Sequence, residues 1–72
     1  LIIPKEHYDS FDVIPPKIMA SMTEFIHKVA SKLNVKDSGY RLITNIGEDG
    51  GQEVHHLHFH LIGGEPVGKL VR

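Results

Sequence analysis

Apolar residues recur at three- and four-residue steps along one long segment of the chain. They are Ile18, Met22, Phe25, Ile26, Val29 and Leu33. This spacing puts them on one face of an amphipathic helix, which we expect from Pro16 to Leu33. Pro15 and Pro16 suit a first helical turn, where a missing N–H costs nothing, and Asn34 with the following "KDSG" ends the helix. We expect this face to pack on the protein's own sheet, although a dimer contact could use part of it.

Three other segments have the pattern of strands. "YRLITNI" (40–46) is rich in β-branched and aromatic residues, and residues 52–62 alternate between apolar and polar. "GEDGG" (47–51) joins them with strong turn chemistry, and "LII" (1–3) predicts a further strand that Pro4 closes. The order predicts an α+β fold, an antiparallel β-sheet with one main α-helix packed on it.

The chain has 72 residues and opens on "LIIPKEHY", without an initiator methionine or a polar lead-in. A free terminus in a buried strand is unusual, because chain ends are normally solvated. A chain this short buries only roughly 60% of its unfolded surface, so its core is marginal. We therefore expect residues 1–72 to form a single domain that lacks its N-terminal segment. The alternative is a naturally short chain that pairs with another subunit.

Charge and hydropathy argue against two kinds of partner. The formal net charge is −1, which gives no electrostatic footprint for nucleic acid. No apolar run approaches the ~20 residues that a membrane helix needs, and no signal peptide is recognisable, so we expect no membrane association. The absence of cysteine fits a reducing compartment, and we expect a cytoplasmic protein.

Four of the six histidines lie within "HHLHFHLIGG" (55–64). In a strand, alternate side chains share a face, so His56, His58 and His60 are expected to stand together. His55 has the opposite parity and is expected near a strand end or an interface. The helix-facing positions are then Leu57, Phe59 and Leu61.

Three interpretations of this histidine face compete. It is a solvated polar face, which strict alternation disfavours, or a zinc site, or a centre for phosphate chemistry. Parallel imidazoles ~6.6 Å apart converge poorly on one ion, and Glu53, on the opposite parity, cannot orient them. Imidazoles can instead attack phosphorus and protonate a leaving group. Gly50 and Gly51 favour this third interpretation, because their backbone N–H groups can approach an anion closely. We expect no metal and no cofactor.

"HLHFHLI" (56–62) matches the His-φ-His-φ-His-φ-φ signature of the histidine triad (HIT) superfamily, where φ is apolar. Residues 39–64 resemble its Hint branch, the nucleoside phosphoramidate hydrolases, and "LIIPKEH" resembles the strand that precedes the helix in that family. The resemblance covers nearly the whole chain. "GGQEV" (50–54) and the tail "GEPVGKLV" (64–71) are more similar to bacterial members than to animal ones.

The resemblance implies a role for each histidine of the triad. His58 would be the nucleophile that takes up a nucleotidyl group. His60 would contact the phosphate and help the leaving group, and His56 would orient His58. His7 matches a family position outside the triad, where we expect a structural or loop role. His27 is expected to be solvated on the helix.

Further positions follow from the same resemblance. Asn45, Gly51 and Glu53 are expected to bind the substrate phosphate. Asn45 and Gly51 match phosphate-binding positions of the family, and Glu53 stands where animal members often have serine. His60, where glutamine would be expected in the uridylyltransferase branch, argues against that branch. Asn45 and the Gly63–Gly64 pair argue against dinucleoside polyphosphate hydrolases.

The implied activity is hydrolysis of the P–N (or P–O) bond of purine nucleoside 5'-phosphoramidates through a covalent nucleotidyl-histidine. The alternatives are a nucleotide- or zinc-binding regulator with little turnover and a dinucleoside polyphosphate hydrolase of the same superfamily. Similar proteins carry an upstream segment that holds much of the nucleoside pocket. They also pair as homodimers through the helix and a sheet edge. We expect that contact to use Met19, Ile26 or Ala30, with an inward-packing set of Met22, Phe25 and Val29.

Overall fold

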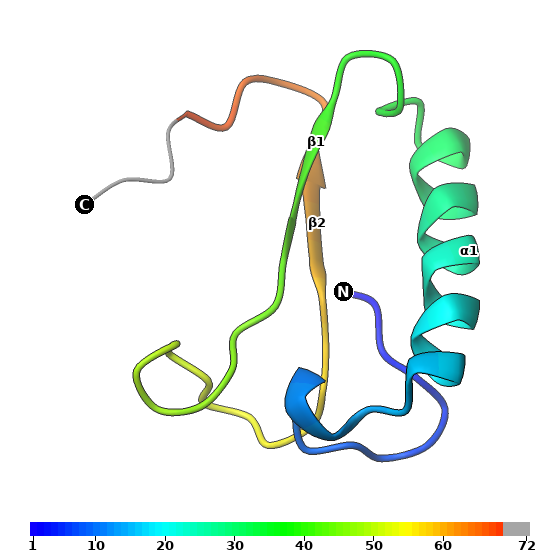
Figure 1. The fold of residues 1–72 in the computed structure, drawn as a ribbon. Helices are drawn as coiled ribbons and strands as arrows, with labels where there is room; N and C mark the ends of the chain where they lie inside the picture. Colours follow the sequence, from blue (N-terminus) through cyan, green and yellow to red (C-terminus); the bar gives the residue numbers. More distant parts are fainter. Residues whose placement is uncertain (69–72) are drawn as a thin grey trace.

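One long helix lies beside a small antiparallel sheet in the computed structural model of the protein, which describes residues 1–68 (Figure 1). The elements in chain order are a short 3-10 helix η1 (Phe11–Val13), helix α1 (Pro16–Lys32) and strands β1 (Tyr40–Ile43) and β2 (His60–Gly63). This confirms the predicted α+β fold. The end of the tail "GEPVGKLV" lies outside the described residues, and no helix within residues 1–68 is long and apolar enough to cross a membrane.

Helix α1 begins and ends where the sequence predicts, to within one residue. Pro15 is its N-cap and Pro16 its first residue. At the other end Asn34 adopts a left-handed φ of 62°, and the Val35 N–H donates to the Ala30 carbonyl at 3.1 Å. The Asn34 N–H donates to the Ser31 carbonyl at 3.2 Å, which completes a Schellman motif. Val35, which follows the helix in this motif, is buried.

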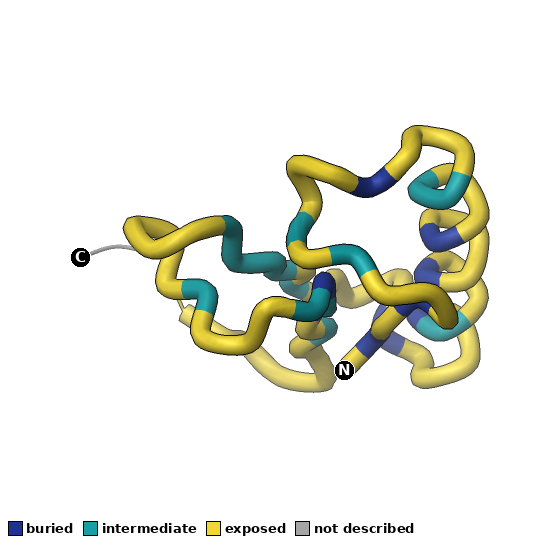
Figure 2. Tube along the Cα trace, turned by 90° about the horizontal axis from the view of Figure 1, so that it is seen from below, coloured by how far each residue is buried: buried dark blue, intermediate teal, exposed yellow. Residues whose placement is uncertain are grey.

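The core forms where one row of α1 meets the chain segments beside it (Figure 2). The buried row on α1 is Met22, Ile26 and Ala30, at four-residue steps. The buried cluster around the first two of these also contains Ile2, Ile14, Leu57 and Phe59. These contacts close one hydrophobic layer between the helix and the histidine-rich segment.

The predicted division of the helix face is wrong for Ile26, Ala30 and Phe25, whereas Met22 is buried as predicted. Ile26 and Ala30, assigned to a dimer contact, are only 3% and 1% exposed within this one chain. Phe25, assigned to the core, is 54% exposed, and Leu33 at the end of the helix is 59% exposed. The apolar stripe is wider than the sheet can cover. The row centred on Ile26 therefore faces inward, and Phe25 is left at the margin.

The strands are shorter than predicted, because a strand lasts only as long as its hydrogen-bonding partner. Strands β1 and β2 pair antiparallel from Tyr40 opposite Gly63 to Ile43 opposite His60. Beyond this point Thr44 uses its side-chain hydroxyl to donate to the His58 carbonyl at 2.8 Å, so the backbone ladder stops. The expected strands over residues 40–46 and 52–62 therefore reduce to the lengths of β1 and β2.

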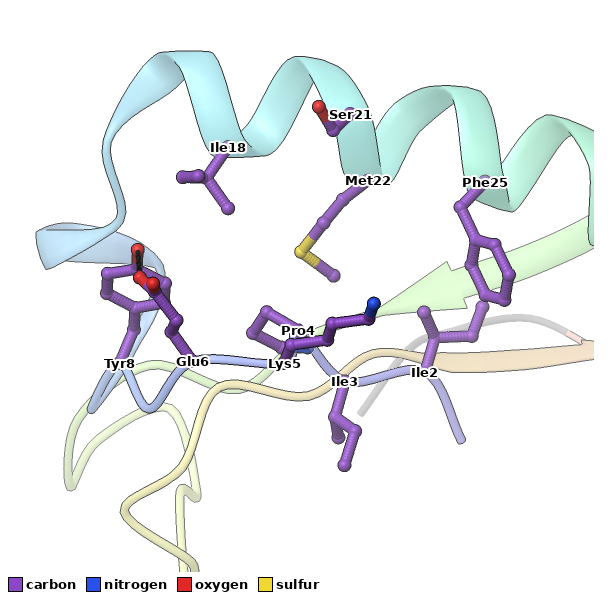
Figure 3. Close-up of a pocket in the computed structure, with 10 residues that line it drawn as sticks. All are labelled: Ile2, Ile3, Pro4, Lys5, Glu6, Tyr8, Ile18, Ser21, Met22 and Phe25. Atoms are coloured by element: carbon purple, nitrogen blue, oxygen red, sulfur yellow. Dashed lines mark hydrogen bonds between the residues drawn. The ribbon is translucent and has the colours of Figure 1, made fainter.

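The N-terminal segment runs along the other side of the histidine-rich stretch. Ile2 and Phe59 exchange backbone hydrogen bonds of 2.8 and 2.9 Å, so the strand expected over residues 1–3 is reduced to a single bridge. Further along, the Leu57 N–H donates to the Tyr8 carbonyl at 2.6 Å. Tyr8 also donates its hydroxyl to Glu6, and this bond raises the pKa of the Tyr8 phenol (Figure 3). Residues 6–9 are thereby held against the histidines.

Candidate active site

The alternation in residues 56–61 separates an apolar side from a histidine side, as predicted. Leu57 and Phe59 are only 1% and 5% exposed, and Leu61 packs against the same core. His56 and His58 are half-buried, and His60 is exposed. The buried apolar side chains anchor the stretch, so that the imidazoles between them are presented on its other side. His55 and His27 are both exposed.

The hydrogen bond of His58 determines which of its ring nitrogens is free. Its Nδ1 lies 2.8 Å from the backbone carbonyl oxygen of His56. A carbonyl oxygen can only accept, so this nitrogen carries the proton. In the neutral ring Nε2 then keeps its lone pair. His58 therefore has the tautomer that a nucleophilic imidazole requires.

The His60 ring is the neighbour of His58 on this face. The two ring centroids lie 5.1 Å apart and the planes are nearly perpendicular, at 82°. Because His60 is exposed, its imidazole can exchange protons with solvent.

The structure adds His7 and Asp9 to the site, although the sequence did not predict them there. The Nδ1 atoms of His7 and His56 lie 2.8 Å apart, and Nε2 of His7 lies 2.9 Å from a carboxylate oxygen of Asp9. The strand pattern offered no carboxylate on the histidine face, yet Asp9 reaches it through His7. The sequence contained one signal for this pair. In "HYD" (7–9), His7 and Asp9 are two residues apart, so in extended backbone their side chains point to the same side.

The glycine turn is braced against Asn45. The Asn45 side chain donates to the Gly50 carbonyl at 2.7 Å, and Gly51 has a left-handed φ of 80°. The residue that precedes Asn45, Thr44, is bonded to the His58 carbonyl, so the start of this turn lies next to the histidine stretch. A Cβ built on Gly51 would lie 3.9 Å from the Asn45 side-chain nitrogen, so Asn45 and Gly51 are close to each other. Glu53 is exposed, and no hydrogen bond within residues 1–68 joins its side chain to the histidines.

Gln52 joins this turn to the N-terminal segment. Its side-chain oxygen accepts from the Gly47 N–H at 2.9 Å, and its side-chain nitrogen donates to the Asp9 carbonyl at 2.5 Å. Gln52 therefore fixes the glycine turn relative to the segment that carries Asp9. After His7 and Asp9, Gln52 is a third residue of the site region that the sequence did not predict there.

The described part of the chain contains no group of side chains arranged to bind a metal ion. No three side chains of histidine, cysteine, aspartate or glutamate within residues 1–68 come together in a way that could hold an ion. The histidine rings pair with each other, with a carbonyl or with Asp9 instead.

The HIT domain family matches residues 1–67. The chain belongs to the HIT family. An uncharacterised HIT-like protein of Helicobacter pylori is 51% identical over 65 residues, which are 90% of this chain and 62% of that protein. The chain therefore spans less than two thirds of the length of this relative.

Two further HIT relatives bear on the fold and the chemistry. The structure of a HIT family hydrolase from Clostridium thermocellum has a TM-score of 0.85 and 42% identity, and the match covers 96% of this chain and 64% of that one. A purine nucleoside phosphoramidase of Escherichia coli is 48% identical over 44 residues, 61% of this chain and 37% of that protein. The likeness to the first extends over the helix, the sheet and the histidine stretch described above.

An apolar groove of about 470 Å³ lies apart from the histidines of this HIT domain (Figure 3). It runs between the N-terminal segment and α1, and its lining includes Ile3, Phe25 and Met22. None of its lining residues belongs to the histidine face. The groove and the candidate active site are therefore separate surfaces.

Proposed function

We propose that this chain carries the catalytic centre of a Hint-type hydrolase, which cleaves the P–N (or P–O) bond of purine nucleoside 5'-phosphoramidates. The observation that carries the proposal is the 2.8 Å contact from His58 Nδ1 to the His56 carbonyl, which leaves Nε2 of His58 free to attack. The phosphoramidase of Escherichia coli, 48% identical over 44 residues, supports the substrate class.

The proposed reaction has two steps. Nε2 of His58 attacks phosphorus, the P–N bond breaks, and His60 donates a proton to the departing amine. Water then attacks the phosphorus of the nucleotidyl-histidine, giving its proton to His60, and the nucleoside monophosphate leaves with His58 restored. The Asn45 side chain, which uses one N–H for the Gly50 carbonyl and has a second, is the proposed donor to the phosphate oxygens. The backbone N–H of Gly51 donates to the Glu48 carbonyl at 3.0 Å, so the turn is proposed to position Asn45.

The mass of the acid-quenched protein tests this mechanism. After incubation with an adenosine phosphoramidate, the full chain is expected to carry the added mass of AMP. His58→Ala is expected to lose that adduct and to lower turnover by several orders of magnitude, because it removes the nucleophile. His27→Ala is the matched control, since it removes an exposed imidazole from α1. Full turnover by His58→Ala would overturn the assignment.

Two alternatives predict different results from the same preparation. A regulator that only binds nucleotide would bind AMP without forming the adduct, and a zinc-dependent protein would lose its activity with a chelator and regain it with zinc alone. We expect turnover to survive exhaustive chelation. A dinucleoside polyphosphate hydrolase would form the adduct but would prefer diadenosine polyphosphates to the phosphoramidate.

A further inference from the structure

Asp9 and His7 form a short hydrogen-bonded path that ends on the triad. Asp9 Oδ1 lies 2.9 Å from His7 Nε2, and His7 Nδ1 lies 2.8 Å from His56 Nδ1. The rings of His7 and His56 lie 4.7 Å apart at an interplanar angle of 56°, so they meet at a tilt. The side chains of Asp9 and His7 are 71% and 61% exposed, which makes their attraction as charges weak. The direction of the hydrogen bonds, which does not depend on that attraction, is the informative property.

We propose that Asp9, acting through His7, fixes the proton of His56 on Nδ1. The Asp9 carboxylate can only accept, so Nε2 of His7 carries a proton. In a neutral His7 ring Nδ1 is then an acceptor, and the proton between the two rings belongs to His56 Nδ1. Asp9 and His7 are positioning residues in this scheme, because they act on the triad through the His56 ring.

The other ring nitrogen of His56, Nε2, is the second place where its proton could lie. His56 Nε2 is buried and has no hydrogen-bond partner among the described residues. This buried atom is an unpaired acceptor when the proton is on Nδ1 and an unpaired donor in the other tautomer, and both are penalised. Burial of Nε2 therefore does not choose between the two forms. The path from Asp9 through His7 is what selects the Nδ1–H form.

Fixing the His56 ring also bears on the nucleophile. The same residue offers its backbone carbonyl to His58 Nδ1, so an anchored His56 ring helps to keep that carbonyl in place. The Asp9 backbone is in turn tied to the glycine turn by Gln52. Loss of the Asp9 carboxylate is thus expected to loosen His56 first and His58 through it.

Long-range ¹H–¹⁵N correlation spectra of the full chain test the tautomer directly. At about pH 8, where unperturbed imidazoles are neutral, His7 is expected in the Nε2–H form and His56 in the Nδ1–H form. The pH matters because a doubly protonated His7 would donate from its Nδ1, and His56 Nδ1 would then have to accept. Asp9→Ala is expected to leave His56 in exchange between its two tautomers.

Two further variants separate the proposed role from a loss of charge or of fold. Asp9→Asn keeps an oxygen that can accept from His7, so it is expected to retain the Nδ1–H form of His56. Asp12→Ala removes a carboxylate from the neighbouring η1, and the wild-type spectrum is expected. Unchanged His56 tautomer in Asp9→Ala, or an Nε2–H form in the wild type, would overturn the inference.

Kinetics provide a second readout, and this part rests on the proposed function. Asp9→Ala is expected to lower kcat by roughly ten- to a hundredfold, by analogy with the loss of an outer hydrogen-bond partner of a metal-binding histidine, with little change in KM. Asp9→Asn is expected to restore most of the rate. If the wild type does not turn over phosphoramidates, the proposed function fails while the spectra still decide the tautomer. An unaltered kcat in Asp9→Ala would refute the positioning role.

Discussion

Gly50 occupies a place in the turn that has no room for a side chain. A Cβ there would overlap the backbone carbonyl oxygen of Ile46, whereas a Cβ on Gly47 would meet nothing within 4 Å. Gly50→Ala is therefore expected to force the turn open and to release the Asn45 bond to residue 50, at a cost of roughly 1–3 kcal/mol. Urea unfolding measures the loss of stability, and the KM of the phosphoramidate reaction measures the effect on Asn45. The free energy of unfolding is expected to fall and the KM to rise.

Gly47→Ala is the matched control for this turn. Gly47 has a φ of 68°, so alanine there is strained by about 1–2 kcal/mol without any clash. The KM effect is expected to be confined to Gly50→Ala, because that variant alone displaces Asn45. Equal KM values for both variants would contradict a role for the braced turn in binding phosphate.

Helix α1 presents two apolar rows that the structure treats differently. Ile26 is 3% exposed and Phe25 is 54% exposed. Ile26→Ala is expected to lower the free energy of unfolding by about 2–5 kcal/mol, because it leaves a cavity in the core. Phe25→Ala is expected to cost about 1 kcal/mol or less. Thermal or urea unfolding of the full chain at one protein concentration measures both, and a larger loss in Phe25→Ala would contradict the observed orientation.

The single chain has apolar side chains and sheet edges that are exposed to solvent, and these surfaces bear on its assembly. We propose a homodimer, because Phe25 and Ile3 are exposed beside an apolar groove and because β1 and β2 form a sheet with open edges. Phe25→Glu is expected to give a folded monomer in sedimentation at micromolar concentration. Ser31→Glu adds the same charge at another exposed position of α1 and is expected to remain dimeric. A wild type that sediments as a fully active monomer would contradict the proposal.

The local patterns of the sequence determined the kind and order of the main elements. Steps of three and four predicted α1 to within a residue, because a helix repeats every 3.6 residues. Alternation at residues 56–61 predicted that Leu57 and Phe59 are buried and that the histidines lie opposite them, since side chains of extended backbone alternate. Both rules depend only on backbone geometry, so neighbouring residues suffice to apply them.

Contacts between distant segments decided the rest. The helix period indicates an apolar face but not its centre, so only packing against Leu57 and Phe59 showed that Ile26, and not Phe25, faces inward. The strands end where their partners do, which no single segment can reveal. His7 and His56 are 49 residues apart in the chain, and their contact exists because the N-terminal segment lies along the histidine stretch. A hydrogen bond between such residues depends on the path of the whole backbone, which local periodicity does not contain.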